Sequence, residues 1–484
     1  MRLSALANVP AAGADPEIAG LTADSRAVKR GYLFAALPGA RADGAAFVPD
    51  AIAKGAVAVL GGEALRARGE TVAKIIDANP RQRLAQMAAR FYGRQPLTIV
   101  AVTGTNGKSS IASFVREIWT ALGHKAASFG TVGVVAPSGT RTLQHTTPDP
   151  IEIHRLLAEL AEEGVDHVAF EASSHGLAQH RADGVVLQAA AFTNLTRDHL
   201  DYHDTFEAYE QAKLRLFTDV LPMGGVAVVN ADSPSADVFV RAALARGQRL
   251  ILVGESERAH LRIASRVPNS LGQQLSIVWD GRSFDVALPL AGAFQASNAA
   301  IAAALVLGLG ADAGAVFEAL DGLKGAPGRL EKVGLTALGV PVYVDYAHTP
   351  DALETVLQAL RPHTAARLWV VFGCGGDRDP GKRPLMGAAA VANADRVIVT
   401  DDNPRTEEAA AIRAAVLKGA PGAHEIGDRA LAIDMAIQSA EEGDLVVIAG
   451  KGHETGQIVG REIRPFNDAE EARAAIALTK GDSR

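Results

Sequence analysis

The segment that most constrains this chain is the glycine-rich hexapeptide Gly104–Ser109, which reads Gly-Thr-Asn-Gly-Lys-Ser. It follows the apolar run Leu97–Val102, which predicts a strand buried on both faces, and it leads into a helical pattern. Glycines let backbone N–H groups approach phosphate oxygens, Lys108 can reach the outer phosphates, and the Ser109 hydroxyl suits magnesium. A strict Walker A loop would have glycine at Val102, so this loop is a shortened relative. We predict a nucleoside triphosphate site here rather than an ordinary turn with a surface lysine.

The composition of the chain excludes several classes of protein. Its 484 residues exceed one typical core, so we expect roughly two to four domains. The net charge of −7 offers no basic surface to a nucleic acid. The chain has neither an apolar run of about 20 residues nor an export signal, and its single cysteine, Cys374, excludes an internal disulfide and a cysteine-rich metal site. We therefore expect a cytoplasmic monomer without a nucleic-acid or membrane partner.

Two stretches that contain glycine and proline, Gly93–Pro96 and Lys324–Arg329, divide the chain, and we place domains at residues 1–93, 94–325 and 326–484. In the second and third domains, apolar runs alternate with helical patterns, of which one begins at Ser109 and is closed by Gly123. The further predicted strands are His167–Glu171, Ala190–Leu195, Val226–Asn230, Val342–Tyr346, Leu368–Phe372, Arg396–Thr400 and Leu445–Ala449. Such alternation predicts an α/β fold of parallel sheets with helices on both faces. Ligands of these sheets bind beyond the carboxyl ends of the strands.

Acidic and basic side chains stand at or after several predicted strand ends in the middle of the chain. Glu171 ends one strand and could hold a magnesium ion that faces the phosphate loop, although a solvated acid is the alternative. The strand Ala190–Leu195 leads into a run rich in potential ligands, where His199 is a candidate second metal ligand. Lys213 lies in the helical segment Tyr209–Phe217, and that pattern alone suggests a surface lysine.

The last third of the chain carries a second group of strand-end residues. Asp345 lies near the end of the predicted strand Val342–Tyr346, and the loop Gly373–Asp379 is not a dinucleotide fingerprint because Arg378 replaces its third glycine. In the turn Asp402–Arg405 a proline restricts the backbone and Arg405 offers a planar fork to a carboxylate, although a polar helix-start turn is the alternative.

Two more positions lie at the corresponding ends of neighbouring strand–helix units, namely Arg383 and the loop Gly450–Glu454. Together with the turn Asp402–Arg405 they could frame a small zwitterion. The arginines would bind its carboxylates and Glu454 would bind its amine.

The order of four motifs resembles that of the Mur ligases of peptidoglycan synthesis. The motifs are Gly-Thr-Asn-Gly-Lys-Ser, Glu-Ala-Ser-Ser-His-Gly, Asp-Tyr-Ala-His-Thr-Pro and Asp-Asn-Pro-Arg, and the likeness runs from Asp24–Arg26 to Gly450–Glu454. The phosphate loop is shared with folylpolyglutamate synthases, whereas the turn Asp402–Arg405 is more specific. It indicates the ligases that add meso-diaminopimelate, rather than lysine, to UDP-N-acetylmuramoyl-L-alanyl-D-glutamate. The resemblance implies a small N-terminal UDP-binding α/β domain, a central P-loop ATPase-like parallel-sheet domain and a C-terminal Rossmann-like domain.

The resemblance also implies roles for individual residues. The positions that match the family's ATP-binding residues are Gly104, Thr105, Asn106, Gly107, Lys108, Ser109, Asn298, Arg329 and Asp345. Those that match the UDP-dipeptide contacts are Ser25, Thr146, Thr147, Ser173, Gln179 and Arg181. Those that match the diaminopimelate pocket are Arg383, Asp402, Asn403, Pro404, Arg405, Gly450 and Glu454. The catalytic and magnesium positions are Lys108, Ser109, Glu171, His199 and Lys213, the last as a carbamate. His145 departs from the family pattern, in which asparagine often precedes the two threonines.

The implied reaction is an ATP-dependent amide ligation with Mg²⁺ as cofactor. ATP would phosphorylate the D-glutamate γ-carboxylate, and the amine of meso-diaminopimelate would attack the acyl phosphate. Four alternatives stay open at this point. They are a nucleotide-dependent switch or transport ATPase, a non-catalytic binding module, the lysine-adding homologue and a folylpolyglutamate synthase.

Overall fold

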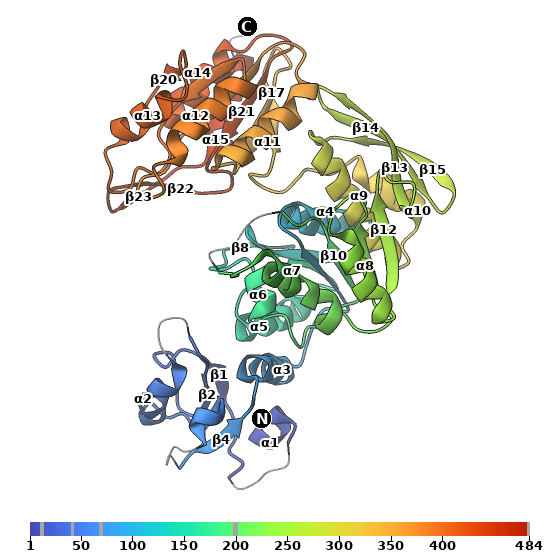
Figure 1. The fold of residues 1–484 in the computed structure, drawn as a ribbon, viewed down its shortest axis with the longest axis vertical. Coiled ribbons are helices and arrows are strands. Elements are labelled where there is room, and N and C mark those ends of the chain that lie inside the picture. Colours follow the sequence, from blue (N-terminus) through green and yellow to red (C-terminus); the bar gives the residue numbers. More distant parts are fainter. Residues whose placement is uncertain (10–13, 40–42, 67–70, 197–201, 482–484) are drawn as a thin grey trace. The chain divides into compact units, whose positions relative to one another are not determined.

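The computed structural model describes residues 1–9, 14–39, 43–66, 71–196 and 202–481 (Figure 1). The chain forms two compact units. The first comprises Met1–Ala112 and Trp119–Ile251, and the second comprises Ser113–Ile118 and Leu252–Arg484. Among the described helices, none is both long and apolar enough to cross a membrane.

The first unit begins with a parallel sheet of order β1-β2-β3-β4. Its strands are Gly20–Thr22, Tyr32–Ala36, Ala58–Gly61 and Ala73–Ile76, and its helices are α1 (Leu3–Ala7), α2 (Val48–Ala53) and α3 (Pro80–Tyr92). Side chains of β2 alternate between two cores. Leu33 packs with residues of α1 and α3, whereas Phe34 packs with residues of α2. This alternation is the period-two pattern of a strand covered on both faces.

The larger sheet of the first unit runs in the order β11-β10-β5-β9-β6-β7-β8. Its strands are β5 (Thr98–Thr103), β6 (Ala126–Gly130), β7 (Gly133–Ala136), β8 (Gly139–Arg141), β9 (His167–Glu171), β10 (Ala189–Phe192) and β11 (Val226–Asn230). Strands β11, β10, β5, β9 and β6 are parallel, whereas β7 and β8 are antiparallel additions. Strands β5, β9, β10 and β11 confirm the predicted runs, although β10 ends at Phe192 rather than Leu195, and β6 was not predicted. In β10 every residue is buried, which explains its unbroken apolar sequence.

Helices join these strands in the order expected of parallel crossovers. They are α4 (Lys108–Ala121), α5 (Pro150–Glu162), α6 (Ser174–Ala178), α7 (Phe206–Arg215) and α8 (Ala236–Ala245), and a π-helical turn, Leu216–Val220, follows α7. Because β5 and β9 are parallel with Val102 opposite Glu171, the ends of both strands lie at one edge of the sheet. The phosphate loop and Glu171 therefore share that edge.

After β12 (Arg249–Gly254), the second unit opens with an antiparallel meander that our sequence analysis did not predict. Its strands are β13 (Leu261–Asn269), β14 (Gly272–Trp279) and β15 (Arg282–Leu288), and helices α9 (Ala293–Gly308) and α10 (Ala313–Leu320) follow. A six-stranded sheet of order β16-β17-β21-β18-β19-β20 comes next. Its strands are Glu331–Leu335, Pro341–Asp345, Leu445–Ala449, Leu368–Phe372, Arg396–Val399 and His424–Glu425 in that order.

Helices cover both faces of this six-stranded sheet, as predicted. One core contains residues of α11 (Pro350–Leu360), α12 (Lys382–Asn393) and α13 (Ala409–Leu417), and the other contains residues of α14 (Arg429–Ser439) and α15 (Asp468–Gly481). A separate hairpin is formed by β22 (Gly456–Val459) and β23 (Glu462–Pro465). All strands of the sheet except β16 run parallel, so the loops after β17, β18, β19 and β21 lie at one edge.

Candidate active site

The phosphate loop, residues 104–107, joins β5 to α4, and residues at the end of β10 fix its shape. Gly104 has a φ of +146°, and a Cβ there would lie 1.9 Å from Thr193 Oγ1, so only glycine fits. Thr193 Oγ1 donates to Asn106 O at 2.6 Å, and Asn106 N donates to Asn194 Oδ1 at 3.0 Å. The loop is therefore held by neighbouring side chains before any ligand arrives.

Two lysines meet at one carbonyl of this loop. Lys108 Nζ donates to Gly104 O at 3.0 Å and to Thr105 O at 2.7 Å. Lys213 Nζ, from α7, donates to the same Gly104 O at 2.8 Å. Lys213 is only 1% exposed and its amine lies 4.4 Å from the centre of the Tyr209 ring. The surface position that the helical pattern alone suggested for Lys213 is therefore wrong, because tertiary packing folds α7 against the loop.

Glu171, at the end of β9, is a buried carboxylate held by Thr131. Its Oε1 accepts from Thr131 N at 2.7 Å and its Oε2 accepts from Thr131 Oγ1 at 3.1 Å. A Cβ on Gly130 would lie 2.1 Å from Glu171 Oε1, so glycine leaves room for this carboxylate. Glu171 is 1% exposed. The alternative of a solvated strand-end acid is wrong, and the buried anion is compensated by hydrogen bonds.

Residues predicted to bind the UDP-dipeptide gather beside Glu171. Thr147 Oγ1 donates to Glu171 O at 2.8 Å and accepts from Ser173 N at 2.9 Å. Arg181 NH1 donates to Thr147 O at 2.6 Å, and its NH2 donates to Gln179 Oε1 at 2.8 Å. The cluster thus joins groups from the segment before α5, from α6 and from the turn after it.

Thr146 belongs to the same cluster, whereas Ser25 does not. Thr146 Oγ1 lies 3.0 Å from Thr131 Oγ1. Ser25 lies in the turn after β1, where its carbonyl accepts from Lys54 Nζ at 3.1 Å. His199 lies outside the described residues. Our sequence analysis missed Thr131, because nothing in a lone threonine indicates its contact with a carboxylate forty residues later.

A second group of predicted nucleotide contacts forms within the second unit. Asn298 Nδ2, on α9, donates to Gln295 Oε1 at 3.0 Å, and Gln295 Nε2 donates to Arg329 O at 3.1 Å. The Arg329 guanidinium lies 4.7 Å from the centre of the Tyr346 ring. Asp345 accepts from two backbone N–H groups, those of residues 330 and 347, both at 2.7 Å. Burial raises the pKa of Asp345, and the positive charge of Arg329 opposes that shift.

The predicted amino-acid pocket is built around Asn403. Its Nδ2 donates to Glu454 Oε2 at 2.9 Å, and its Oδ1 accepts from Lys451 Nζ at 3.0 Å. Gly450 has a φ of +117°, and a Cβ there would lie 2.8 Å from Asp402 Oδ2. The turn after β19 and the loop after β21 therefore meet as predicted. Sequence reasoning did not single out Lys451, although it stands three residues before Glu454.

The two predicted arginines of this pocket differ in their partners. Arg405 has a φ of +52°, and its NH1 donates to Gly376 O at 2.8 Å. Arg383 NH2 donates to both carboxylate oxygens of Glu407, at 2.8 and 2.9 Å. The hydrogen bond from Arg383 lowers the pKa of Glu407. Glu407 therefore occupies one nitrogen of Arg383, whereas the buried Nε of Arg383 has no hydrogen-bond partner among the residues that the structure describes.

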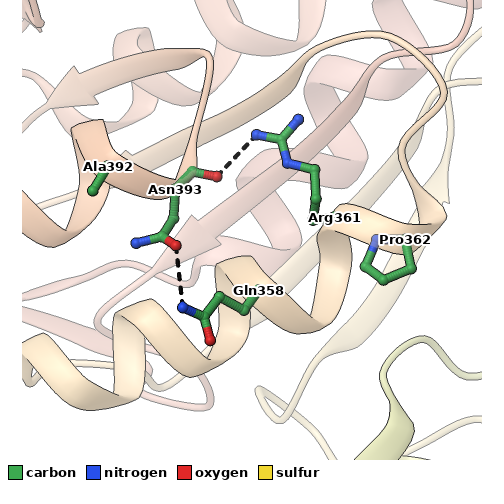
Figure 2. A pocket seen from close by; sticks show the side chains of 5 residues that line it. All are labelled: Gln358, Arg361, Pro362, Ala392 and Asn393. Atoms are coloured by element: carbon green, nitrogen blue, oxygen red, sulfur yellow. Dashed lines mark hydrogen bonds between the residues drawn. The ribbon is translucent and has the colours of Figure 1, made fainter.

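Two further features of the structure lie apart from the predicted residues. A pocket of about 330 Å³ on the second unit is lined by Gln358, Arg361, Pro362, Ala392 and Asn393 (Figure 2). Its polar groups bond one another, since Arg361 NH2 donates to Asn393 O at 2.9 Å and Gln358 Nε2 donates to Asn393 Oδ1 at 3.3 Å. None of the predicted site residues lines it, so its position gives no support to a substrate site.

The second feature is a group of possible metal ligands on the first unit. Ligand atoms of His124, Asp166 and His167 lie within 4.8 Å of one another, and no other group of three was found in the part of the chain that the structure describes. His167 begins β9, whereas Glu171 ends it, so this group and the predicted magnesium residues are at opposite ends of one strand.

Comparisons with known proteins cover nearly the whole chain. Residues 17–92 match the model described as "Mur ligase family, catalytic domain", residues 102–306 match "Mur ligase middle domain", and residues 328–452 match "Mur ligase, glutamate ligase domain". Two curated relatives, from Bradyrhizobium diazoefficiens and Caulobacter vibrioides, are each 54% identical. The first matches 95% of this chain and 95% of its own length, and the second matches 98% of each. Both are named UDP-N-acetylmuramoyl-L-alanyl-D-glutamate–2,6-diaminopimelate ligase.

A solved structure is similar over the same extent. It bears the same ligase name, is 36% identical, covers 99% of each chain and superposes with a TM-score of 0.78.

Proposed function

This chain belongs to the Mur ligase family, and we propose that it adds meso-diaminopimelate to UDP-N-acetylmuramoyl-L-alanyl-D-glutamate at the expense of ATP. The observation that carries the proposal is the arrangement at one edge of the larger sheet of the first unit. There the phosphate loop follows β5 and is contacted by Lys108 and Lys213. Glu171 ends the neighbouring strand β9, and Thr147 donates to its carbonyl oxygen. A nucleotide phosphate and an acceptor carboxylate can therefore be bound side by side.

The first half of the proposed reaction transfers a phosphoryl group. The γ-carboxylate of D-glutamate attacks the terminal phosphorus of ATP, the bond to ADP breaks, and an acyl phosphate forms. Lys108, at the start of α4, can turn its amine from the loop carbonyls to the phosphoryl oxygens, where it stabilises developing negative charge. Arg181 and Ser173 would orient the acceptor, since both are anchored to Thr147.

Magnesium fits the oxygen donors that this edge provides. The two hydrogen bonds from Thr131 leave acceptor capacity on the Glu171 carboxylate, and Ser109 adds a hydroxyl. The ion would be held by these two residues and by Lys213 as a carbamate, with His199 completing the predicted set. Bound magnesium would neutralise charge on the transferring phosphoryl group. An unmodified Lys213 amine is a donor and could not serve as a ligand.

The second half of the reaction forms the amide. The amine of diaminopimelate attacks the acyl carbonyl, inorganic phosphate leaves, and the amine loses a proton. Arg405 and Glu454 of the second unit would bind the far carboxylate and the far amine of this substrate. Asn298, Arg329 and Asp345 would contribute to the binding of ATP. The division into domains at 1–93, 94–325 and 326–484 stays a prediction, as does the placement of Ser25 on the uridine nucleotide.

Phosphate release, measured against a panel of amino acids and acceptors, tests the proposed function. We expect release only when ATP, UDP-N-acetylmuramoyl-L-alanyl-D-glutamate and diaminopimelate are all present, with stoichiometric formation of the UDP-tripeptide. Release without any amino acid would favour a switch or transport ATPase, and no release under any condition would favour a binding module. Preference for lysine, or for a folate acceptor with glutamate, would assign the chain to one of the other two classes.

A further inference from the structure

Lys451 is a fully buried cation for which the proposed function has no role. Its side chain is 0% exposed, and its ammonium contacts Asn403 Oδ1 at 3.0 Å and Glu454 Oε2 at 3.1 Å. Burying an ammonium costs several kcal/mol unless partners compensate, so its position calls for a physical reason. Both of its partners belong to the predicted amino-acid pocket.

The two oxygens of Glu454 have different surroundings. Oε2 accepts from Asn403 Nδ2 at 2.9 Å as well as from Lys451 Nζ at 3.1 Å. Oε1 accepts no hydrogen bond from the residues that the structure describes, and the Glu454 side chain is 34% exposed. Two donors on one oxygen fix the carboxylate plane, which leaves Oε1 as the oxygen open to an incoming cation.

Asn403 is fixed by the same arrangement. Its Oδ1 accepts from Lys451 Nζ at 3.0 Å and from Ile458 N at 2.9 Å, which leaves its Nδ2 pointing at Glu454. Lys451 therefore bridges the turn after β19 and the loop after β21 through two side chains at once. Its ammonium donates to Asn403 Oδ1 and to Glu454 Oε2, the carboxylate oxygen that Asn403 Nδ2 also contacts.

We propose that Lys451 is a positioning residue for diaminopimelate, because it orients Glu454 so that Oε1 receives the far ammonium of this substrate. This inference rests on the proposed function. Lys451 neutralises one carboxylate charge, while the buried Asp402 supplies a second. Among the nearby cations, Arg429 is paired with Asp468, Arg329 lies over Tyr346, and Arg405 is the expected partner of the far carboxylate of the substrate. The far ammonium would therefore be attracted locally, by the open Oε1 of Glu454.

Kinetics of Lys451→Met test the proposal, because methionine keeps an unbranched side chain and removes the charge. A lost charge-assisted hydrogen bond corresponds to about a 10- to 100-fold increase in KM for diaminopimelate. KM for ATP and for the UDP-dipeptide should stay within about twofold of the parent, because the proposed function places neither substrate at Glu454. Lys332→Met is the matched control, since Lys332 is a half-buried lysine of the same unit whose Nζ donates to Leu271 O at 3.1 Å, outside the pocket.

A double-mutant cycle with Glu454→Gln separates positioning from a merely structural role. If Lys451 acts through Glu454, Lys451→Met should change KM for diaminopimelate by less than about threefold in the Glu454→Gln background. Equal effects in both backgrounds would overturn the proposal, as would an unchanged or lowered KM in the single variant. Lys451→Gln keeps an uncharged N–H donor group and provides a second variant, and failure of both variants to fold would assign Lys451 to the fold instead. A parent enzyme that does not use diaminopimelate would contradict the proposed function itself, an outcome visible before any variant is made.

Discussion

The amine of Lys213 lies 2.8 Å from the carbonyl oxygen of Gly104, although 109 residues separate them along the chain. Lys108 donates to the same oxygen, so two ammonium groups converge on one carbonyl of the phosphate loop. This convergence places two like charges at one carbonyl of the loop, where the positive potential favours an anionic ligand. A nucleotide phosphate would supply the anion, and carbamylation of Lys213 would change the sign of its charge.

The first prediction concerns Lys213. We expect Lys213→Ala to lower kcat by about 10²-fold or more, because an anionic ligand beside the phosphoryl group would be lost. Bicarbonate or a small carboxylate such as acetate should restore part of the activity by occupying the vacated space. Lys418→Ala, at an exposed position at the end of α13, should behave as the parent. High-resolution density that shows an unmodified amine in the ATP-bound, active enzyme would contradict the carbamate.

The second prediction concerns Lys108. Lys108→Ala should reduce ligation by about 10²-fold or more at saturating ATP, because its charge is directed at the transferring phosphoryl group. The loss should appear in kcat, measured as phosphate release in the presence of all three substrates. Lys324→Ala is the control, since this lysine is exposed and its backbone N–H, which the substitution keeps, donates to Glu117 Oε2 at 2.8 Å. Near-normal turnover of the Lys108 variant would remove this residue from the catalytic set.

Sequence patterns predicted most parallel strands of both larger sheets, although not β6 or β20, because the signal of a buried strand is local. Strand β21 is short and wholly apolar, and β9 has an apolar centre between His167 and Glu171, as expected for strands buried on both faces. The meander β13–β15 was not predicted because its strands are half exposed. Charged and polar residues alternate with apolar ones along them, so they resemble surface segments. The predicted site residues clustered where parallel strands end, since topology alone brings those ends to one edge.

Pairings between side chains of different loops were beyond sequence reasoning. Arg383 lies near the amino end of α12 and donates to Glu407 from the loop after β19. Nothing in the sequence around either residue indicates that the two form a pair. The helical pattern predicted a surface position for Lys213 because α7 has a weak apolar stripe. The burial of Lys213 becomes evident only in the folded structure. Such contacts depend on the relative placement of distant segments, which local periodicity does not encode.

The third prediction concerns the buried pair Arg429 and Asp468, both 0% exposed. Arg429 also donates to the carbonyl oxygens of Ala449 at 3.0 Å and Asp401 at 3.4 Å, which flank the predicted amino-acid pocket. Arg429→Met leaves the Asp468 carboxylate buried without its partner, so we expect the second unit to lose about 3–5 kcal/mol of unfolding free energy. Urea unfolding followed by circular dichroism measures this loss.

The control for that experiment is an exposed pair of the same unit. Arg361 and Asp395 form an ion pair at 2.7 Å, and each side chain is 42% exposed. Arg361→Met should cost only about 0–1 kcal/mol because solvent screens this pair. Equal losses in the two variants would mean that the burial of Arg429 contributes nothing special to stability.

The fourth prediction concerns pH. Burial lowers the pKa of His154 from 6.5 to about 4, and its imidazole Nε2 lies 3.1 Å from Asp183 O. Between pH 6.5 and pH 4 the unfolded chain therefore binds a proton that the folded chain does not. The stabilisation is fully present above pH 6.5 and is lost as the pH falls towards 4, by about 3 kcal/mol in all. Urea unfolding of the first unit at pH 7 and pH 4.5 should reveal most of this loss.

His154→Gln tests the assignment, since glutamine can still donate to Asp183 O but does not titrate. Its unfolding free energy should depend less on pH over this range than that of the parent. The exposed His424 is the control, because His424→Gln should keep the parent's pH dependence. An unchanged slope in the His154 variant would show that other groups cause the acid loss.

The last prediction is that Arg405 sets the choice of amino acid. Meso-diaminopimelate differs from lysine by a second carboxylate at the far end, so discrimination requires a cation in a partly desolvated pocket. The left-handed backbone of Arg405, with φ of +52°, and the contact of its NH1 with Gly376 O at 2.8 Å hold the guanidinium close to its working position. Little side-chain entropy is then lost when a carboxylate binds.

Arg405→Ala should therefore raise KM for diaminopimelate by about 10- to 100-fold, the equivalent of one charge-assisted hydrogen bond, and by more if two are lost. KM for ATP and for the UDP-dipeptide should change little. Lysine should remain a poor substrate, because removing the arginine creates no acid to hold its ammonium. Arg464→Ala, on the exposed strand β23, is the control and should match the parent. A variant at position 405 that used diaminopimelate as well as the parent would refute this specificity.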